Sequence, residues 1–593
     1  MDCINASWSR KAERKTYMNR HGANPQPKPK IQNMSGTLRR ITGYLLKRKG
    51  KLILTIVTVA LSSVLALAGP FLIGVAIDNY IASGDEDGLL WLLGGLALVY
   101  VSYSGVLFLQ NYWMADIAQK TVYELRDDLF QHFHKLPIAF FDKRRHGELM
   151  SRVTNDIENI SSTLNSSIIQ IASGILTLAG SIVVMLYLSP ILTVVTLQII
   201  PLMFGGMKWI TKRTGPKFKE QQRHLGDLNG FIEEAISSRH IVKMFSREDE
   251  MIADFMGRNE QLREAGYLAQ AYSGFIPKLM NVLNNTSFAF IALAGGILAL
   301  NGQASVGTIV IFTEYARQFT RPLNDLANQY NTMLSAVAGA ERVFDIIDTE
   351  ETVDGKTGTR HNILGEVIFK DVSFSYEKGK ETLSGVTFSA SKGETIALIG
   401  PTGSGKTTIM NLLARFYEPD SGAIVFDGVD SRNISGASLR GQMGFVLQDT
   451  VLFEETVMEN IRYGRLNATD EEVVEAARLA NAHSFIMKMP DGYAAKLSQE
   501  GSGISQGQRQ LIAIARAILA DPVILILDEA TSSIDTITEL HIQEALGRLM
   551  EGRTSFVIAH RLNTVRRADQ VIRLRAGRIE AMGTYEDVVE HHG

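Results

Sequence analysis

A glycine-rich loop near residue 400 has the residue types and spacing of a phosphate-binding site. The run GPTGSGKTT follows the apolar segment ETIALIG and precedes the helical pattern IMNLLARFY, so it fits G-x-x-x-x-G-K-[ST] between a strand and a helix. Loops of this kind wrap phosphates with backbone N–H groups, while the lysine reaches the outer phosphates and the hydroxyl ligates Mg²⁺. We therefore predict a nucleotide-phosphate site that comprises Gly400, Thr402, Gly403, Ser404, Gly405, Lys406, Thr407 and Thr408.

Two carboxylates follow a second apolar segment. The predicted strand Val523 to Leu527 is followed by Asp528 and Glu529, at the strand end where open α/β sheets bind ligands. Asp528 suits the Mg²⁺ shell, and Glu529 suits a base that polarises an attacking water. The alternative is that these carboxylates only cap a helix. A third segment, TSFVIA, ends in His560, whose side chain could contact a γ-phosphate.

A third chemical signal is the stretch GSGISQGQRQ at residues 501–510. Small and amide residues stand directly before the apolar run LIAIARAILA, and free N–H groups at such a helix start can bind an anion. The simpler interpretation is an ordinary helix cap at Ser505. The residues alone leave both interpretations open.

Two kinds of element must position these residues. From Glu366 onward, short β-rich segments alternate with helical patterns, which indicates an α/β nucleotide-type domain. Before it lie six apolar stretches long enough to cross a bilayer, of which the last two are more polar than the others. The predicted spans are near 52–77, 89–112, 167–188, 190–210, 279–300 and 306–330.

The short loops between the predicted spans carry no basic residue and should face outward, whereas the long connections 113–166 and 211–278 are rich in Lys and Arg and should lie inside. Both termini are then cytoplasmic. The basic, polar residues 1–33 contain no apolar core of a secretory signal and are expected to be disordered. The inner connections have long charged helical patterns, which should contact the soluble domain.

Composition excludes several classes of function. The net charge of −3 gives no global argument for nucleic-acid binding, so no nucleic-acid partner is expected. The single cysteine, Cys3, excludes an internal disulfide and makes a cysteine-based metal site improbable.

The chain resembles the ATP-binding cassette (ABC) transporters. GPTGSGKTT, FVLQD, ISQGQ, ILILDEATSSIDT and IAHRLNT stand in that family's order after six spans, so the chain resembles an exporter half-transporter of the inner or plasma membrane. The resemblance implies ATP and Mg²⁺ as ligands, Tyr376 stacking on adenine, Gln448 joining Mg²⁺ to the membrane domain, and Asp535 communicating across a dimer. It also implies catalytic roles for Glu529, His560 and Gln448, and a metal set of Thr407, Gln448 and Asp528.

The same resemblance gives ISQGQ a role, because the family signature binds the ATP held by the opposite cassette. Ser505, Gln506, Gly507 and Gln508 would then face a partner's nucleotide. Arg152 and Asp156 lie in what resembles the first intracellular coupling region, and Ser237 to Phe245 resembles the second. The alternative for any of these charged residues is a solvated surface.

The expected fold is an all-α six-helix transmembrane domain with long intracellular helical extensions, followed by an α/β P-loop ABC ATPase domain. The expected boundaries are a tail at 1–33, the transmembrane domain at 34–345, a linker at 346–364 and the nucleotide-binding domain at 365–593.

One departure from the family pattern points to a second, different subunit. Gln506 places a bulky amide where the usual signature has glycine, whereas the other site residues conform: Lys406, Gln448, Asp528, Glu529 and His560. An intact hydrolytic half-site beside a modified signature is typical of one member of a heterodimer. A homodimer that tolerates Gln506 is the alternative.

The sixth span carries Glu314, Arg317 and Arg321 on one helix face. They would line a substrate cavity, or Glu314 and Arg317 would only pair with each other. The expected activity is ATP-driven export of amphipathic drugs or lipid-like compounds. The alternatives are a homodimeric lipid or peptide exporter, a nucleotide-gated channel or regulator, and an exporter-fold importer.

Overall fold

The computed structural model describes residues 33–351, 361–377, 379–448, 450–497, 503–528, 534–559 and 561–590. The described chain forms two compact units. The first contains the helices up to residue 349 except for residues 135–146, and the second contains residues 135–146 together with everything from residue 350. The predicted tail falls almost entirely outside the described residues.

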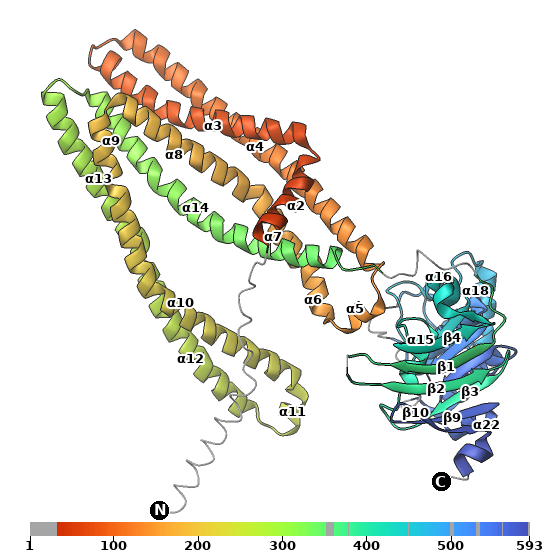
Figure 1. The fold of residues 1–593 in the computed structure, drawn as a ribbon. Coiled ribbons are helices and arrows are strands. Elements are labelled where there is room, and N and C mark those ends of the chain that lie inside the picture. Colours follow the sequence, from red (N-terminus) through yellow and green to blue (C-terminus); the bar gives the residue numbers. More distant parts are fainter. Residues whose placement is uncertain are drawn as a thin grey trace, which may run out of the picture. The chain divides into compact units, whose positions relative to one another are not determined.

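The described residues of the first unit form helices joined by short turns (Figure 1). Its α-helices are α2 (Met34–Leu46), α3 (Lys49–Val75), α4 (Glu86–Phe133), α6 (His146–Ser151), α7 (Ile157–Ser162), α8 (Ile168–Leu188), α9 (Pro190–Leu197), α10 (Ile199–Ser237), α11 (Arg239–Met244), α12 (Glu248–Ser273), α13 (Phe275–Leu300) and α14 (Val306–Ile347). Three π-helical turns continue these helices: η1 (Ala76–Ile81), η2 (Arg152–Asp156) and η3 (Thr163–Ser167).

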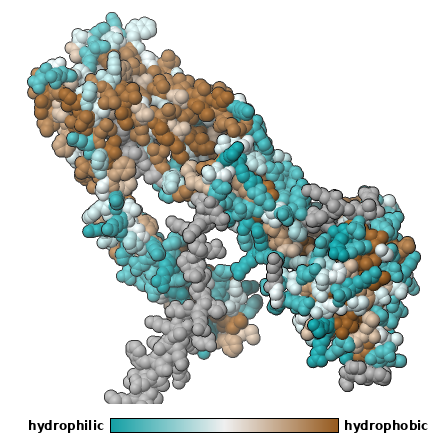
Figure 2. Space-filling view, viewed as in Figure 1, coloured by the Kyte–Doolittle hydropathy of each residue, from teal (hydrophilic) through white to brown (hydrophobic). Residues whose placement is uncertain are grey.

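Five helical runs of the described chain are long and apolar enough to cross a membrane, and they contain the first five predicted spans. They are Lys49–Ile81, Glu86–Phe133, His146–Leu188, Pro190–Ser237 and Glu248–Leu300. The sixth predicted span lies in α14, which is a continuous helix of 42 residues but is not among these five. Figure 2 shows the apolar surface that these helices present.

The helices are longer than a bilayer requires. The 48 residues of α4 extend over about 72 Å at 1.5 Å per residue, against a hydrocarbon thickness of about 30 Å. The expected helical extensions beyond the membrane are therefore present.

Polar caps start the helices that follow the short loops. The Asp85 carboxylate accepts from the Gly88 N–H, the Ser189 hydroxyl from Leu192 N–H, and the Ser305 hydroxyl from Thr308 N–H. Each cap satisfies an N–H group that has no partner within its helix. Asp85, Ser189 and Ser305 therefore each lie between two of the spans predicted from the sequence.

The second unit is built on two sheets. A four-stranded antiparallel sheet has the order β2-β1-β4-β5, and a six-stranded sheet has the order β10-β9-β3-β8-β7-β6. The strands are β1 (Val367–Phe374), β2 (Leu383–Ala390), β3 (Thr395–Ile399), β4 (Ser421–Phe426), β5 (Val429–Asp430), β6 (Met443–Val446), β7 (Ile524–Asp528), β8 (Thr554–Ile558), β9 (Gln570–Arg575) and β10 (Arg578–Gly583).

Helices alternate with these strands, as the α/β pattern predicted. They are α5 (Ile138–Asp142), α15 (Lys406–Leu413), α16 (Gly436–Arg440), α17 (Val457–Arg462), α18 (Asp470–Leu479), α19 (His483–Ile486), α20 (Gln506–Ala520), α21 (Thr536–Met550) and α22 (Leu562–Arg567). Strands β3, β6, β7, β8 and β9 run parallel, so their carboxyl ends meet at one edge of the sheet.

Candidate functional site

The predicted phosphate loop joins β3 to α15 at the edge of the six-stranded sheet where the carboxyl ends of the parallel strands lie. Gly400 has φ +144° and Gly405 has φ +106°, and a Cβ at these positions would lie 2.2 Å from the Leu574 carbonyl oxygen and 2.5 Å from Leu383 Cδ2. Only glycine fits both the backbone angles and the close contacts. The tight loop aims the first N–H groups of α15 at the space in front of it, which is the arrangement that binds phosphate.

Lys406 closes over this loop. Its Nζ donates to the carbonyl oxygens of Gly400 at 2.8 Å and Pro401 at 2.9 Å, and only 8% of the residue is exposed. Burial lowers the pKa of Lys406, and the negative charge of Asp528 opposes that shift. Among the described residues the buried Ser404 hydroxyl has no hydrogen-bond partner, so the loop retains polar capacity for a ligand.

Oxygen donors stand at the same edge of the sheet, at the ends of strands β7 and β6. Asp528 ends β7, and Gln448 follows β6 by two residues on the adjacent parallel strand. Thr407 is exposed on the first turn of α15. A hydroxyl, a carboxylate and an amide oxygen are a donor set that fits Mg²⁺. Glu529 and His560 lie outside the described residues.

Tyr376 belongs to an aromatic cluster just after β1. Its ring lies 4.8 Å from Phe374 and 5.0 Å from Tyr417, both edge to face, and its hydroxyl accepts from Asn411 Nδ2 at 3.1 Å. An open cavity of about 1080 Å³ lies beside Tyr376. The cluster fixes the ring next to a space that can admit a planar base.

A short piece of the first inner connection packs on the ATPase-type unit. Residues 135–146, which include α5, belong to this unit, and Asp142 accepts a 2.6 Å hydrogen bond from the Tyr417 hydroxyl. Burial and this bond raise the pKa of Tyr417. Sequence reasoning missed Asp142, because nothing in the spacing links it to a residue 275 positions away.

The stretch ISQGQ starts α20, and the simple cap interpretation is confirmed. The Ser505 hydroxyl accepts from Gln508 N–H at 3.2 Å, and Gln508 Oε1 accepts from Ser505 N–H at 2.9 Å. Gly507 is buried, and a Cβ there would lie 2.4 Å from Thr538 Cγ2, whereas Gln506 is exposed. The cap leaves the Gln506 side chain at the surface, so capping does not exclude a role in binding an anion.

Asp535 also caps a helix. Its carboxylate accepts from Thr538 N–H at 3.0 Å at the start of α21, and this backbone bond lowers the pKa of Asp535. The side chain is exposed, so the residue can contact a second subunit while it caps.

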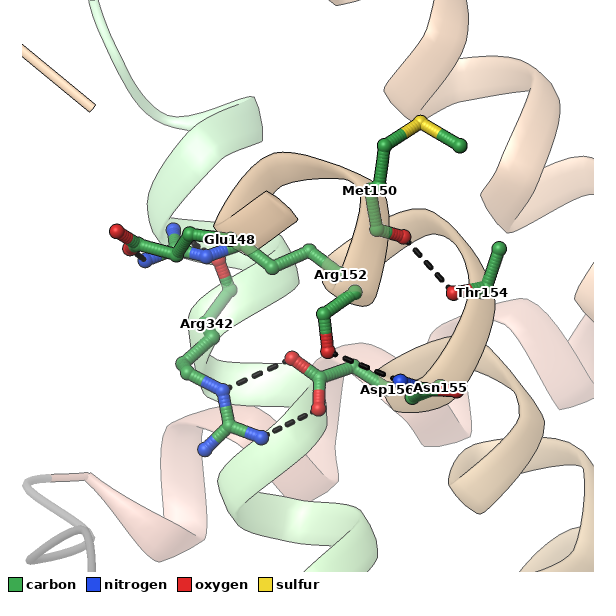
Figure 3. Close-up of polar contacts among 8 residues, drawn as sticks. Glu148, Met150, Arg152, Thr154, Asn155, Asp156 and Arg342 are labelled. Atoms are coloured by element: carbon green, nitrogen blue, oxygen red, sulfur yellow. Dashed lines mark hydrogen bonds and ion pairs between the residues drawn. The ribbon is translucent and has the colours of Figure 1, made fainter. Parts of the chain in front are cut away.

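Asp156 is not part of a solvated charged surface (Figure 3). It is 4% exposed, and its two carboxylate oxygens accept from Nε and Nη2 of Arg342 near the end of α14. Arg152 pairs with Glu148 and donates to the Arg342 carbonyl oxygen at 3.4 Å. Within the first unit these groups fasten the turn η2 to α14.

The remaining predicted positions are on the surface of the first unit. In and beside α11, the apolar side chains of Ile241, Met244 and Phe245 are 59%, 79% and 70% exposed. Arg317 donates to Glu314 at 3.4 Å, so the predicted local pair is present, with side chains 64% and 39% exposed. The side chain of Arg321 lies outside the described residues.

Comparison with known proteins agrees with this geometry. The family model described as ABC transporter transmembrane region matches residues 52–323, and that described as ABC transporter matches residues 383–532. The uncharacterized ABC transporter ATP-binding protein YfiC of Bacillus subtilis (strain 168) is 57% identical over 95% of this chain and 94% of its own length.

Two further similarities cover most of the chain. A fatty acid ABC transporter ATP-binding/permease protein of Mycobacterium bovis is 43% identical over 80% of this chain and 75% of its own length. A solved structure of a bacterial Atm1-family ABC exporter with ATP bound has a TM-score of 0.74 and 29% identity, and the match covers 92% of this chain and 96% of the other. With a helical membrane domain followed by a phosphate-loop ATPase, the chain belongs to the ABC transporters, as an exporter half-transporter of the plasma membrane whose ATPase activity is coupled to transport.

Proposed function

We propose that this half-transporter exports small amphipathic molecules as one subunit of a heterodimer, with its ATPase domain and both termini in the cytoplasm. The observation that carries the heterodimer is a conforming nucleotide half-site in the same chain as a signature whose exposed Gln506 replaces the usual glycine. Two such half-transporters hold each ATP between the phosphate loop of one and the signature of the other.

In this proposal each residue of the nucleotide site has a separate role. Tyr376 stacks on adenine, while the residues from Gly400 to Thr408 hold the phosphates with their N–H groups and with the ammonium of Lys406. Glu529 orients a water against the γ-phosphate, and His560 contacts the γ-phosphate. This assignment is supported by the buried Lys406 over a glycine loop and by Asp528 at the end of β7, two strands away at the same edge of the sheet.

Thr407, Gln448 and Asp528 would hold the Mg²⁺. The ion, when bound, offsets negative charge on the phosphates and helps to orient them. Gln448 also stands at the start of the segment that follows β6, and by the family resemblance it links the nucleotide site to the membrane domain.

The signature of this chain would face the partner's ATP through Ser505, Gln506, Gly507 and Gln508, with Asp535 close to the dimer interface. A glutamine side chain at the helix start occupies space where backbone N–H groups approach phosphate. The site completed by Gln506 should therefore bind and turn over ATP more weakly than the site completed by Glu529.

The ATPase rate of the purified chain tests this proposal. Alone in detergent or nanodiscs, it should hydrolyse ATP slowly, and Gln506→Gly should raise the rate several-fold because it restores the usual signature. Glu529→Gln should abolish hydrolysis but retain ATP binding, whereas Glu551→Gln, on a surface turn after α21, is the matched control and should leave the rate unchanged. Rapid ATPase activity of the unmodified chain, coupled to transport without a partner, would refute the heterodimer and favour a homodimer.

The exposed apolar side chains of Ile241, Met244 and Phe245 support the proposal that this chain works with a second subunit. Exposed apolar side chains of this size beside a short helix fit a docking contact with the partner's ATPase domain. The segment 135–146 makes the corresponding contact within its own chain.

For the substrate, we propose an amphiphile with a polar or acidic head group. The relative named as a fatty acid transporter supports this class, and the exposed Glu314–Arg317 pair offers a polar position among apolar spans. Transport of a fluorescent fatty acid and of a cationic amphiphile into inverted vesicles would distinguish the head groups. Arg317→Gln should weaken uptake of the acid selectively, and equal loss of both substrates would contradict the role of Arg317.

A further inference from the structure

A pocket lined by cations lies where the first two spans begin and end. It is open, has a volume of about 630 Å³, and lies between the turn after α2 and the middle of α4. The polar and charged side chains that line it are Lys47, Arg48, Lys49, Lys51, Asp116 and Lys120. We call these residues the basic pocket.

The basic pocket has more positive than negative charge. Asp116 pairs with Lys51 at 2.6 Å and with Lys120 at 2.8 Å, and Glu124 pairs with Lys47 at 3.0 Å and with Arg48 at 2.6 Å. Four cations thus share two carboxylates, and with Lys49 as the fifth cation the group has about three excess positive charges.

These cations are accessible to a ligand. Within the described residues Lys49 forms no ion pair, and the side chains of Lys47, Lys51 and Lys120 are 57%, 49% and 53% exposed. Their N–H groups therefore have capacity for further acceptors.

The position of the basic pocket along the spans places it at head-group level. The apolar run of α3 begins at Leu52, directly after Lys51, and Asp116 and Lys120 follow the apolar run of α4 by one to two turns. Below the charges, the α3 side chains of Ile53, Ile56 and Val57 are 60%, 59% and 55% exposed. Cations above a strip of exposed apolar side chains match a phospholipid, whose phosphate lies above its acyl chains.

The pocket is also on the side of the membrane that leads to the ATPase domain. Arg40 of α2 pairs with Asp348 at 2.5 Å, and Tyr44 stacks on Phe344 at 6.4 Å, both at the C-terminal end of α14. Figure 1 shows α2 beside this end of the helices. The chain continues from α14 to the ATPase domain, so the lipid in question comes from that leaflet.

We propose that the basic pocket binds the phosphodiester head group of an anionic phospholipid, with the acyl chains along the exposed face of α3. A zwitterionic phospholipid carries a compensating cation and gains less from three excess positive charges. The pocket anchors the start of α3 to the leaflet that faces the ATPase domain. This inference does not depend on the transported substrate.

Native mass spectrometry of the full chain, released from detergent with defined lipids, tests the proposal. Phosphatidylglycerol should bind with higher occupancy than phosphatidylcholine of the same chain length. Lys49→Gln should lower phosphatidylglycerol affinity by about fivefold, and Lys49→Gln with Lys120→Gln by about 25-fold, since each surface cation contributes about that factor. Lys392→Gln, an exposed lysine of the ATPase domain, is the matched control.

Three outcomes would overturn the lipid assignment. The two lipids could bind equally, the Lys49→Gln variant could lose no more affinity than Lys392→Gln, or inorganic phosphate could raise the unfolding temperature as much as phosphatidylglycerol does. The last result would assign the pocket to soluble anions. Unfolding temperatures of lipid-free variants serve to verify that each variant is folded, and a variant that fails this check is replaced by Lys49→Ala alone.

Discussion

The Asp156–Arg342 pair should be one of the strongest single contacts in the first unit. Two charge-assisted hydrogen bonds join the side chains, the carboxylate is 4% exposed, and the Arg342 side chain is 35% exposed. Removal of one partner from a buried pair costs about 3 to 5 kcal/mol, because the other charge is left without compensation. Since water reaches part of Arg342, we expect the lower end of this range.

Substitutions of Asp156 and of Arg342 should differ in their cost to stability, because only the Asp156 side chain is deeply buried. Arg342→Gln leaves a buried carboxylate unpaired and should lower the free energy of unfolding by about 3 kcal/mol. Asp156→Asn leaves a guanidinium that water can partly hydrate, and it should cost about 1 to 2 kcal/mol. The double variant leaves no unpaired charge, so it should be more stable than Arg342→Gln alone, with a coupling energy of about 2 kcal/mol.

Unfolding in mixed detergent and SDS micelles, followed by fluorescence, measures these differences. Arg263 and Glu260 on α12 provide the control, because they form the same two-bond arrangement with side chains 69% and 62% exposed. Breaking that exposed pair should have no measurable effect. If the losses at Arg342 and Asp156 simply add, the reasoning from burial is wrong.

Three further pairs of substitutions, each a test variant with its control, probe the ATPase domain. Gly507→Ala should lower the free energy of unfolding by about 1 to 3 kcal/mol, because the added Cβ overpacks against α21. Gly547→Ala, with no atom within 4 Å of the added Cβ, should instead stabilise α21 by about 0.5 to 1 kcal/mol. Equal effects of the two substitutions would contradict the packing argument. Ser505→Asp should keep the cap and the unfolding temperature but slow ATP hydrolysis at the partner's site, because the added carboxylate repels phosphate. Its control is Thr469→Ala, which breaks the capping box of α18 and should lower the free energy of unfolding by about 1 kcal/mol with normal ATPase activity. An unchanged ATPase rate in Ser505→Asp would show that the signature is not part of the site. Tyr417→Phe should increase the hydrogen exchange of residues 135–146, because it removes the bond to Asp142. Its control, Tyr493→Phe, loses a hydrogen bond to His483 and should leave that exchange unchanged. Unchanged exchange in Tyr417→Phe would show that the bond to Asp142 does not hold this segment.

Local signals in the sequence predicted a large part of this architecture. The phosphate loop lies between a strand and a helix, and the alternating β and helical patterns form the predicted α/β domain. Contacts at short spacing were also predictable, such as Glu314 with Arg317 and the cap by Ser505. The last two contacts join residues three apart, so the local sequence contains all the information needed to predict them.

Long-range pairs could not be predicted in this way. Asp156 meets Arg342 across 186 residues and Asp142 meets Tyr417 across 275, and each residue looks like one more charge or aromatic in a mixed run. The helix α2 has no counterpart among the predicted elements, because it is too short and too polar to be a span. Which charges become buried depends on packing between elements, and periodicity along one element does not contain that information.

Two of the three places where the chain passes between the units lie together. Within the first unit, the His132 ring Nε2 donates to the Thr349 carbonyl oxygen at 3.0 Å. Within the second, Lys135 pairs with Glu351 at 3.3 Å. Both contacts join the segment at residues 132–135 to the segment at residues 349–351, so the crossings at 134–135 and 349–350 lie side by side.

The third crossing, at residues 146–147, is held differently. On one side Asp142 bonds to Tyr417, and on the other Asp156 is fastened to α14 through Arg342. Because both flanking segments are fixed to their own units, any relative movement of the units has to be absorbed by the few residues between Asp142 and Asp156 and by the paired crossings. Within this chain the covalent connections between the units are therefore short segments, and each is flanked by a polar side-chain contact within one unit or the other.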